Sequence, residues 1–385
     1  MTASIPLSLY IHIPWCEKKC PYCDFNSHLA KAEINEPAYI NALLDDLSKD
    51  LSRFKAQVVD RELSSIFIGG GTPSLFSADS FKALLAGVKQ RIGFSEEIEI
   101  TSEANPGSSE TEKFYGFREA GVNRLSIGIQ SFNDIYLKAL GRVHNQGEAL
   151  KAAQYAKQAG FDNFNLDLMF GLPNQTYEHA IEDVQQALAL GSTHLSCYQL
   201  TIEPNTLFHH NPPITPDDDA LWQIQESLQK EIYNSGFLQY EVSAYAKQNK
   251  QCQHNLNYWQ FGDYLGIGAG AHGKLTDQYG GITRTWKIKH PANYLKLDKQ
   301  YIGGIETISP EQQSFEFMMN ALRLTDGFDL SLLDERVQQS TSDIQEKLEK
   351  HQSQGLIDYQ NNVLVPTERG RQMLDSMLQD YLVDT

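Results

Sequence analysis

The stretch Leu7-Ser-Leu-Tyr-Ile-His-Ile-Pro-Trp-Cys16-Glu-Lys-Lys-Cys20-Pro-Tyr-Cys23 decides the fold, because it joins an apolar run directly to a cluster of cysteines. Its first seven residues are mostly β-branched, aromatic or aliphatic, which predicts a buried strand. The three cysteines follow at once, separated by gaps of three and two residues. Chemistry that begins where a first strand ends is typical of α/β barrels, whose sites form at the carboxyl ends of the strands.

The first 205 residues repeat one theme, in which a short apolar run precedes a polar or glycine-rich turn and a segment of helical period. The expected strands are Leu7–Ile13, Ser65–Ile68, Ile98–Thr101, Arg124–Ile129, Asn163–Met169 and His194–Leu200. Apolar residues at three- and four-residue spacing predict helices at Glu36–Phe54, Ala78–Ile92, Gln146–Ala159, Tyr177–Leu190 and Asp217–Tyr233. This alternation predicts an α/β fold, a partial (β/α)6 TIM-like barrel over residues 1–205.

Two further domains are expected after the barrel. Residues 206–308 form an extension or a cap, because from about residue 239 the chain is rich in aromatic residues and glycine and holds only short strand-like pieces. Residues 309–385 form a small α-rich domain, in which helical segments precede a hairpin at 356–365 and a last helix. That order is winged-helix-like.

Acidic side chains dominate the composition, with 32 Lys and Arg against 49 Asp and Glu and a net charge of −17. This charge repels phosphate backbones and anionic lipids, so no nucleic-acid partner is expected. The winged-helix-like segment shares the bias, with 6 basic and 14 acidic side chains, which argues against DNA binding. Five cysteines, an N-terminus unlike a secretion signal and the lack of a long apolar stretch indicate a cytoplasmic protein.

The clustered cysteines Cys16, Cys20 and Cys23 point to a metal centre. A zinc site would need a fourth ligand nearby, and the next cysteine, Cys197, lies on an apolar strand where a buried structural thiol is expected. Three thiolates instead suit a [4Fe–4S] cluster that keeps one iron open. An open iron can bind a small molecule.

The spacing Cys16-x3-Cys20-x2-Cys23 resembles the signature of the radical S-adenosylmethionine (SAM) family. The resemblance implies that the three cysteines hold the cluster and that SAM chelates the open iron. Such proteins cleave SAM to a 5′-deoxyadenosyl radical. The glycine run Gly69-Gly70-Gly71-Thr72, after the second strand, resembles the family's motif for the amino group of SAM, and it is no Walker A loop because no Gly-Lys-Ser/Thr follows.

Within that family, the relatives of oxygen-independent coproporphyrinogen III oxidase are similar along most of the chain. The shared motifs begin at Tyr10, Gly69, Glu103, Arg124 and Asp167. The similarity implies SAM contacts from Tyr10, Tyr22, Gly70, Gly71, Thr72, Glu103, Gln130, Arg142 and Asp167. Two departures separate this chain from the oxidase, which has a further cysteine where Phe25 stands and a longer segment before the first strand.

The run His254-Asn255-Leu256-Asn257-Tyr258-Trp259 resembles the haem motif of the HemW-type haem chaperone branch of this family. An imidazole can bind haem iron, and aromatic rings can pack on a flat porphyrin. The resemblance implies that His254, Asn255, Tyr258 and Trp259 bind haem. It also implies delivery of haem to respiratory haem proteins, a homodimer, and membrane association through those partners. His272 is a further candidate to face haem, whereas Cys252 lies outside the motif.

Three functions follow from these patterns. The first is a haem chaperone that holds haem, [4Fe–4S] and SAM. The second is the enzyme coproporphyrinogen III oxidase, which the two departures oppose. The third, a nucleic-acid-binding regulator, is opposed by the charge. The sequence leaves open whether SAM is cleaved. Gly268–Gly273 formally fits a dinucleotide motif, but no convincing helix follows it.

Overall fold

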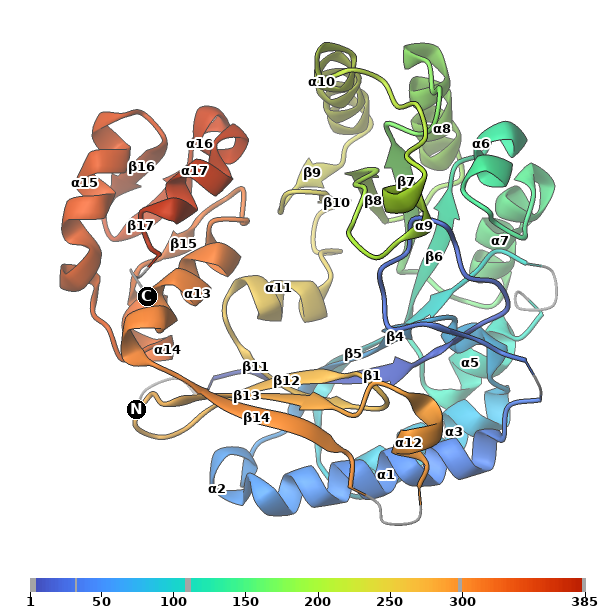
Figure 1. Cartoon of the computed structure of the whole chain (residues 1–385), viewed down its shortest axis with the longest axis horizontal. Coiled ribbons are helices and arrows are strands. Elements are labelled where there is room, and N and C mark those ends of the chain that lie inside the picture. The colour runs from blue at the N-terminus through green and yellow to red at the C-terminus, as the bar shows by residue number, and fades with distance from the viewer. Residues whose placement is uncertain (1–4, 32, 108–111, 297–299, 383–385) are drawn as a thin grey trace.

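A twelve-stranded sheet runs through most of the chain (Figure 1). The computed structural model describes residues 5–31, 33–107, 112–296 and 300–382. The six predicted strands form the centre of the sheet as parallel neighbours in sequence order. They are β1 (Leu7–Ile13), β4 (Leu63–Gly70), β5 (Phe94–Ala104), β6 (Arg124–Gln130), β7 (Phe164–Phe170) and β8 (His194–Gln199). In the described residues β8 does not pair back to β1, so the predicted partial barrel is confirmed.

Helices cover the outer face of this sheet (Figure 1). They are α1 (Glu36–Arg53), α2 (Lys55–Val58), α3 (Ala78–Lys89), α5 (Phe114–Ala120), α6 (Asp134–Ala139), α7 (Gln146–Gln158), α8 (Tyr177–Ala189) and α10 (Asp218–Asn234). The long helices begin within one residue of the predicted starts because a polar side chain caps each first turn. The capping residues are Asn35, Ser77, Asn145, Thr176 and Asp217.

Residues 238–308 lengthen the sheet at both ends. At one end β11 (Asp263–Ile267) runs parallel to β1, and β12 (His272–Thr276), β13 (Ile282–Lys287) and β14 (Ile302–Ile308) continue antiparallel. At the other end β10 (Ala244–Ala246) pairs with β8, and β9 (Leu238–Gln239) with β10. Two short helices also lie here, α11 (Gln253–Trp259) and α12 (Pro291–Tyr294). Helix α11 lies on the inner face of the sheet, opposite α1 (Figure 1).

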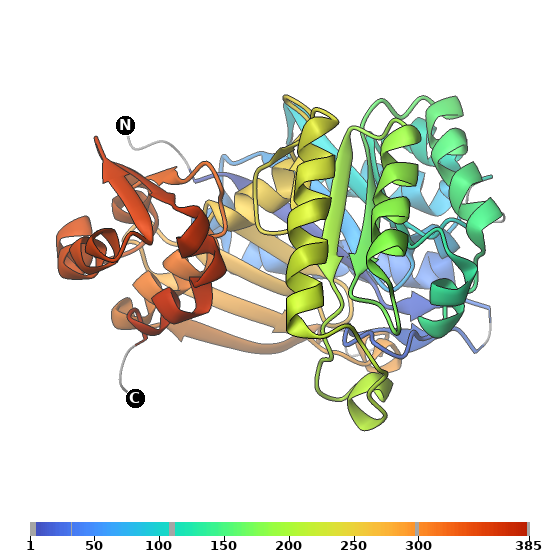
Figure 2. The same ribbon diagram turned by 90° about the horizontal axis from the view of Figure 1, so that it is seen from above.

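The C-terminal region packs beside the antiparallel strands around an apolar core that includes Phe261, Ile282 and Ile308 of the sheet extension, at the end of the molecule away from α6 and α7 (Figure 2). Its helices are α13 (Pro310–Ala321), α14 (Ser331–Arg336), α15 (Gln345–Ser353), α16 (Glu368–Gln372) and α17 (Leu374–Gln379). The predicted hairpin is β16 (Ile357–Gln360) and β17 (Val363–Pro366), which also pairs with β15 (Phe328–Asp329). Asn361 and Asn362 turn it with φ of 51° and 67°, the geometry of a two-residue type I′ turn.

Shorter pieces complete the description. They are β2 (Trp15–Cys16), β3 (His28–Leu29), α9 (Leu207–His210) and the 3-10 turns at Pro73–Leu75 and Thr341–Ile344. Among the described residues, no helix combines the length and the apolar character that a membrane crossing requires.

A buried ion cluster fixes the sheet extension to α1. Lys287 of β13 is fully buried, and its Nζ lies 2.6 Å from Asp46 Oδ1 and 2.7 Å from Asp50 Oδ2. Tyr294 Oη also donates to Asp46 Oδ2 at 2.6 Å. Burial raises the pKa of Asp50 to about 6, although Lys287 opposes this shift. The ammonium group of Lys287 and the carboxylates of Asp46 and Asp50 therefore compensate each other's charge inside the protein.

Replacing Lys287 with alanine leaves two buried carboxylates without their cation. We expect the free energy of unfolding to fall by about 3–5 kcal/mol, the cost typical of breaking a buried ion pair. Urea denaturation followed by circular dichroism measures it. Lys350→Ala is the matched control, since Lys350 is 52% exposed beside Asp380, and such surface pairs contribute about 0–1 kcal/mol. Equal losses in the two variants would contradict the assignment.

Candidate functional site

The three clustered cysteines meet at one cavity. Strand β1 delivers the chain to Cys16, and the following loop carries Cys20 and Cys23 before β3 pairs back with β2. All three thiols line a cavity of about 580 Å³ at the carboxyl ends of the parallel strands. The other two cysteines, Cys197 and Cys252, are buried and do not line it. The structure therefore brings together the three thiols that the sequence singled out.

The three thiols share one cavity with a guanidinium group. In the described residues, no three His, Cys, Asp or Glu side chains converge closely enough to hold one metal ion. Burial raises the pKa of Cys16 and Cys23, so a bound cation is needed to favour their thiolates. Arg142 donates to Cys20 Sγ at 3.8 Å. Three thiols around one enclosed space, with a guanidinium at one of them, suit an anionic iron–sulfur cluster.

The glycine run packs the end of β4 against the cysteine loop. Gly70 has a φ of +114°, and a Cβ there would lie 2.5 Å from the His12 ring. A Cβ on Gly71 would lie 2.5 Å from the Trp15 carbonyl oxygen. The amides of Gly71 and Thr72 donate to the carbonyls of Ile13 and Trp15 at 2.8 and 2.7 Å. These amides thus hold the loop that carries Cys16, and the glycines permit the close approach.

Most of the predicted SAM contacts line the same cavity. They are Tyr22, Gly70, Gly71, Thr72, Glu103, Gln130, Arg142 and Asp167. Arg142 is fixed by Asn105 Oδ1 at 2.6 Å and the Gly128 carbonyl oxygen at 2.8 Å. Tyr10 differs from the others, because it lines a neighbouring cavity.

Two carboxyl groups give this cavity its electrostatic character. Glu103 Oε2 accepts from the Gly70 amide at 3.0 Å, and Asp167 accepts from Ser126 and Asn165 at 3.0 and 2.7 Å. Burial, together with the charge of Asp167, raises the pKa of Glu103 to about 7. Burial also raises the pKa of Asp167. A cationic ligand would relieve the cost of keeping both groups ionised.

The floor of the cavity holds polar residues that sequence reasoning missed. They are Arg124, Asn165, His194, Ser196 and Tyr198. Tyr198 donates to Gln130 Oε1 at 2.9 Å, and Gln130 has a left-handed φ of 69°. The sequence did contain a signal for Arg124. Arg124, Ser126, Gly128 and Gln130 occupy every second position of one strand, and alternate strand residues share a face.

The predicted haem-motif residue His254 is buried on the inner face of the sheet. It is 1% exposed, and it lies on α11, where an aromatic loop was expected. Its Nδ1 contacts Ser65 Oγ at 2.9 Å and its Nε2 contacts Tyr258 Oη at 3.1 Å. Burial and the charge of Arg124 lower the pKa of His254 to about 3. The ring is therefore a neutral imidazole with both nitrogens engaged inside the protein.

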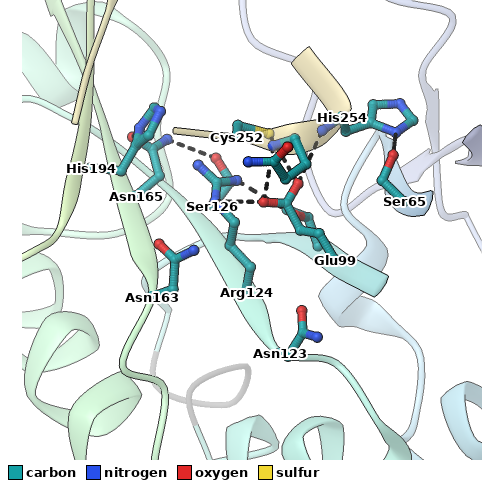
Figure 3. Close-up of polar contacts among 12 residues, drawn as sticks. Ser65, Glu99, Asn123, Arg124, Ser126, Asn163, Asn165, His194, Cys252 and His254 are labelled. Atoms are coloured by element: carbon teal, nitrogen blue, oxygen red, sulfur yellow. Dashed lines mark hydrogen bonds and ion pairs between the residues drawn. The ribbon is translucent and has the colours of Figure 1, made fainter. Parts of the chain in front are cut away.

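Glu99 of β5 holds the start of α11 (Figure 3). It accepts from the amides of Gln253 and His254, both at 3.1 Å, and from Cys252 Sγ at 3.4 Å. Arg124 Nε lies 3.9 Å from the same carboxylate. A carboxylate at a helix N-terminus satisfies amides that lack partners in the helix. Helix α11, which carries the predicted haem motif, is thus attached through Glu99 to Arg124 at the floor of the first cavity.

The remaining motif residues point in different directions. Asn255 lines the first cavity, whereas Tyr258 lines the neighbouring one. Trp259 lines neither of these two cavities; it packs against the C-terminal core, with the Arg323 guanidinium 4.6 Å from its ring. The motif thus joins the two cavities and the C-terminal region instead of presenting one flat aromatic surface.

The second cavity has a volume of about 840 Å³ and adjoins the first. The residues that line both cavities are Cys23, Asp24, Phe25, Ser27, Gly70, Glu103 and Glu203. Its far side is formed by Tyr258 of α11, Tyr264 of β11 and His272 of β12. It falls within the size range of protein sites for small ligands and cofactors.

Comparison with known proteins identifies relatives over 98% of the chain. Residues 10–187 match the radical SAM superfamily, and residues 308–373 match the HemN C-terminal domain. Heme chaperone HemW of Haemophilus influenzae is 51% identical over 98% of both chains. Heme chaperone HemW of Escherichia coli is 47% identical over 98% of this chain and 99% of its own. The Mycobacterium tuberculosis protein of the same name is 32% identical over 98% and 95%.

Among solved structures, the E. coli coproporphyrinogen III oxidase HemN, a radical SAM enzyme, has the same fold. Its TM-score is 0.82 over 98% of this chain and 90% of its own, at 21% identity. At this identity the likeness concerns the fold alone.

Replacing Cys16, Cys20 or Cys23 singly by serine should remove iron and sulfide from anaerobically reconstituted protein, because three thiolates are the minimum set for a cluster with one open iron. Iron analysis and visible absorbance measure this loss, and we expect about four irons per chain in the unmodified protein. Cys197→Ala is the control, since Cys197 is buried outside the cavity. Full iron in any of the three variants, or equal loss in the control, would reject the ligand assignment.

Proposed function

This chain belongs to the HemW family of haem chaperones within the radical SAM superfamily, and on that basis we propose that it binds haem and delivers it to haem proteins of respiration. The same proposal includes a homodimer. It also includes contact with the membrane through the respiratory haem proteins that accept the haem. The five cysteines are free thiols, which suits the reducing cytoplasm, and we place the protein there.

We further propose that Cys16, Cys20 and Cys23 hold a [4Fe–4S] cluster and that SAM occupies the first cavity. When bound, the cluster supplies an open iron for the amino and carboxylate groups of SAM and an electron for its reduction. The chain's own residues position the ligand. Glu103 and Asp167 accept from ribose hydroxyls or an ammonium group and favour a cationic ligand, while Arg142 holds the Cys20 side of the cavity.

The observation that carries the haem proposal is the second cavity. It shares a wall with the cysteine loop, and the predicted haem motif contributes Tyr258 to its other side. Its volume of about 840 Å³ suits a large flat ligand, and its tyrosine rings suit an apolar macrocycle. His254, Asn255 and Trp259 then serve haem binding by fixing α11, on which Tyr258 lies.

The alternative function is radical decarboxylation of coproporphyrinogen III, as in the enzyme whose fold this chain shares. One observation opposes it. Phe25 stands where the oxidase pattern has a further cysteine, and its side chain is 60% exposed at the rim shared by both cavities. The oxidase consumes coproporphyrinogen III, whereas the chaperone leaves it unchanged. One experiment therefore separates the two functions.

Anaerobic protein with its cluster restored should take up haem to about one per chain and should leave coproporphyrinogen III unchanged in the presence of SAM and a reductant. Haem titration by absorbance and chromatography of the porphyrins measure the two outcomes. Haem transfer is then followed as recovered activity of a haem-depleted respiratory enzyme. Formation of protoporphyrinogen, or failure to retain haem, would reject the chaperone proposal.

The pH dependence of SAM binding should report Glu103. Burial raises the pKa of Glu103 to about 7, so below pH 7 this carboxyl group is protonated in the protein without ligand. A cationic ligand must then displace the proton in order to bind. SAM affinity should therefore fall about tenfold from pH 7 to pH 5.5, the change expected for one proton on this pKa. Equilibrium binding to anaerobic protein measures it. Glu103→Gln should bind SAM more weakly with a shallower profile, to which only Asp167 of the two carboxyl groups still contributes, and an unchanged slope in that variant would exclude Glu103 as the cause.

A further inference from the structure

One histidine in the second cavity has a free ring. His272 begins β12, is exposed, and lines this cavity. Within the described part of the chain, its imidazole makes no hydrogen bond. The other two histidines of this cavity are engaged or buried. His12 is bonded through both nitrogens, to Tyr10 Oη at 2.9 Å and to the Asn26 carbonyl oxygen at 3.0 Å. His28 Nε2 has no hydrogen-bond partner among the described residues, but it is buried, and the ring packs edge to face on His290 with centroids 5.2 Å apart.

The surroundings of His272 favour the form of imidazole that binds iron. Partial burial and the charges of Lys289 and Arg284 lower its pKa, so the ring is neutral at physiological pH. A neutral ring has a nitrogen lone pair for a metal, and histidine is a common axial ligand of haem iron. By contrast, His254 would have to break its bonds to Ser65 and Tyr258 before it could reach a ligand.

Side chains of both charges line this cavity. The acidic residues Asp24, Glu103 and Glu203 all belong to the wall that it shares with the first cavity. The basic residues Lys19 and Lys289 line only the second. In a chain with a net charge of −17, two lysines at one cavity form a local site for anions. A ligand that is largely apolar and carries carboxylates could pair those carboxylates with the two lysines.

Aromatic rings supply the apolar contact. Tyr258 and Tyr264 meet edge to face with centroids 4.5 Å apart, and both line the cavity together with Tyr10. Such rings pack well against a flat macrocycle. His272 is on the strand next to Tyr264, since Tyr264 of β11 pairs with Lys274 of β12. The free imidazole and the tyrosines therefore belong to adjacent strands of one wall.

We propose that haem occupies the second cavity with His272 as a ligand of its iron, with its propionates toward Lys19 and Lys289. In this arrangement His254 is a positioning residue, because it holds α11 and thereby Tyr258 at the cavity wall. The inference rests on the proposed function, since it names the site for the haem that a chaperone would carry.

The test compares four proteins: the unmodified chain, His272→Ala, His254→Ala and the control His210→Ala, whose side chain is exposed on α9 and does not line the cavity. Haem titration gives the affinity, and the absorbance and electron paramagnetic resonance spectra of ferric haem give the axial ligand. We expect His272→Ala to weaken binding about thirtyfold, as for a dominant contact, and to lose the histidine signature. Added imidazole should restore that signature.

His254→Ala should keep the histidine signature of whatever haem it binds but lower the melting temperature of the apoprotein, as expected for loss of a buried hydrogen-bonded anchor. His210→Ala should match the unmodified protein. A histidine signature that survives in His272→Ala, or one lost in a folded His254→Ala, would overturn the assignment. If the unmodified chain binds no haem, the proposed function fails instead, and the two failures are thus distinguishable.

The role of Lys19 and Lys289 needs a separate experiment, because we assign these lysines to the propionates and not to the iron. Changing Lys19 and Lys289 together to glutamate should weaken the binding of haem but leave the binding of haem dimethyl ester, which has no carboxylates, nearly unchanged. Equal weakening for both ligands would show that the lysines do not contact the propionates and would overturn that part of the proposal.

Discussion

The parallel pairing of β1 with both β4 and β11 is the constraint on which the site depends. Because β1 has a parallel neighbour on each side, its carboxyl end opens onto two loops at once. The glycine run at the end of β4 forms one flank, and the turn between β11 and β12 forms the other. The cysteine loop that leaves β1 is therefore the partition between the two cavities, and its residues Cys23, Asp24, Phe25 and Ser27 line both.

A second constraint keeps helix α11, which carries the predicted haem motif, in place on the inner face of the sheet. Helix α11 is only seven residues long, and so short a helix needs outside partners for its first amides. Glu99 supplies them from β5, and Arg124 of β6 lies beside that carboxylate and lines the first cavity (Figure 3). The helix that walls the second cavity is thus anchored to the floor of the first.

Sequence reasoning recovered the parts of this structure that local patterns encode. The six parallel strands are apolar runs, and polar caps mark the long helices, so both could be predicted. The three cysteines lie within eight residues of each other and lead directly to one cavity. The placement of His254 could not be found this way, because its burial depends on Ser65, 189 residues away. Helix α11 was missed because seven residues give too little periodicity to separate a helix from a loop.

The shared wall gives the two cavities a physical link. Glu103 faces both, and its pKa is raised by burial and by the charge of Asp167, so its protonation responds to any cation placed in either cavity. Gly70 donates to the same carboxylate and has a backbone that only glycine adopts readily. A ligand in the first cavity that fixes the charge of Glu103 therefore changes the field felt by a ligand in the second. If haem and SAM occupy the two cavities as proposed, this carboxylate is the charged group that lies between them.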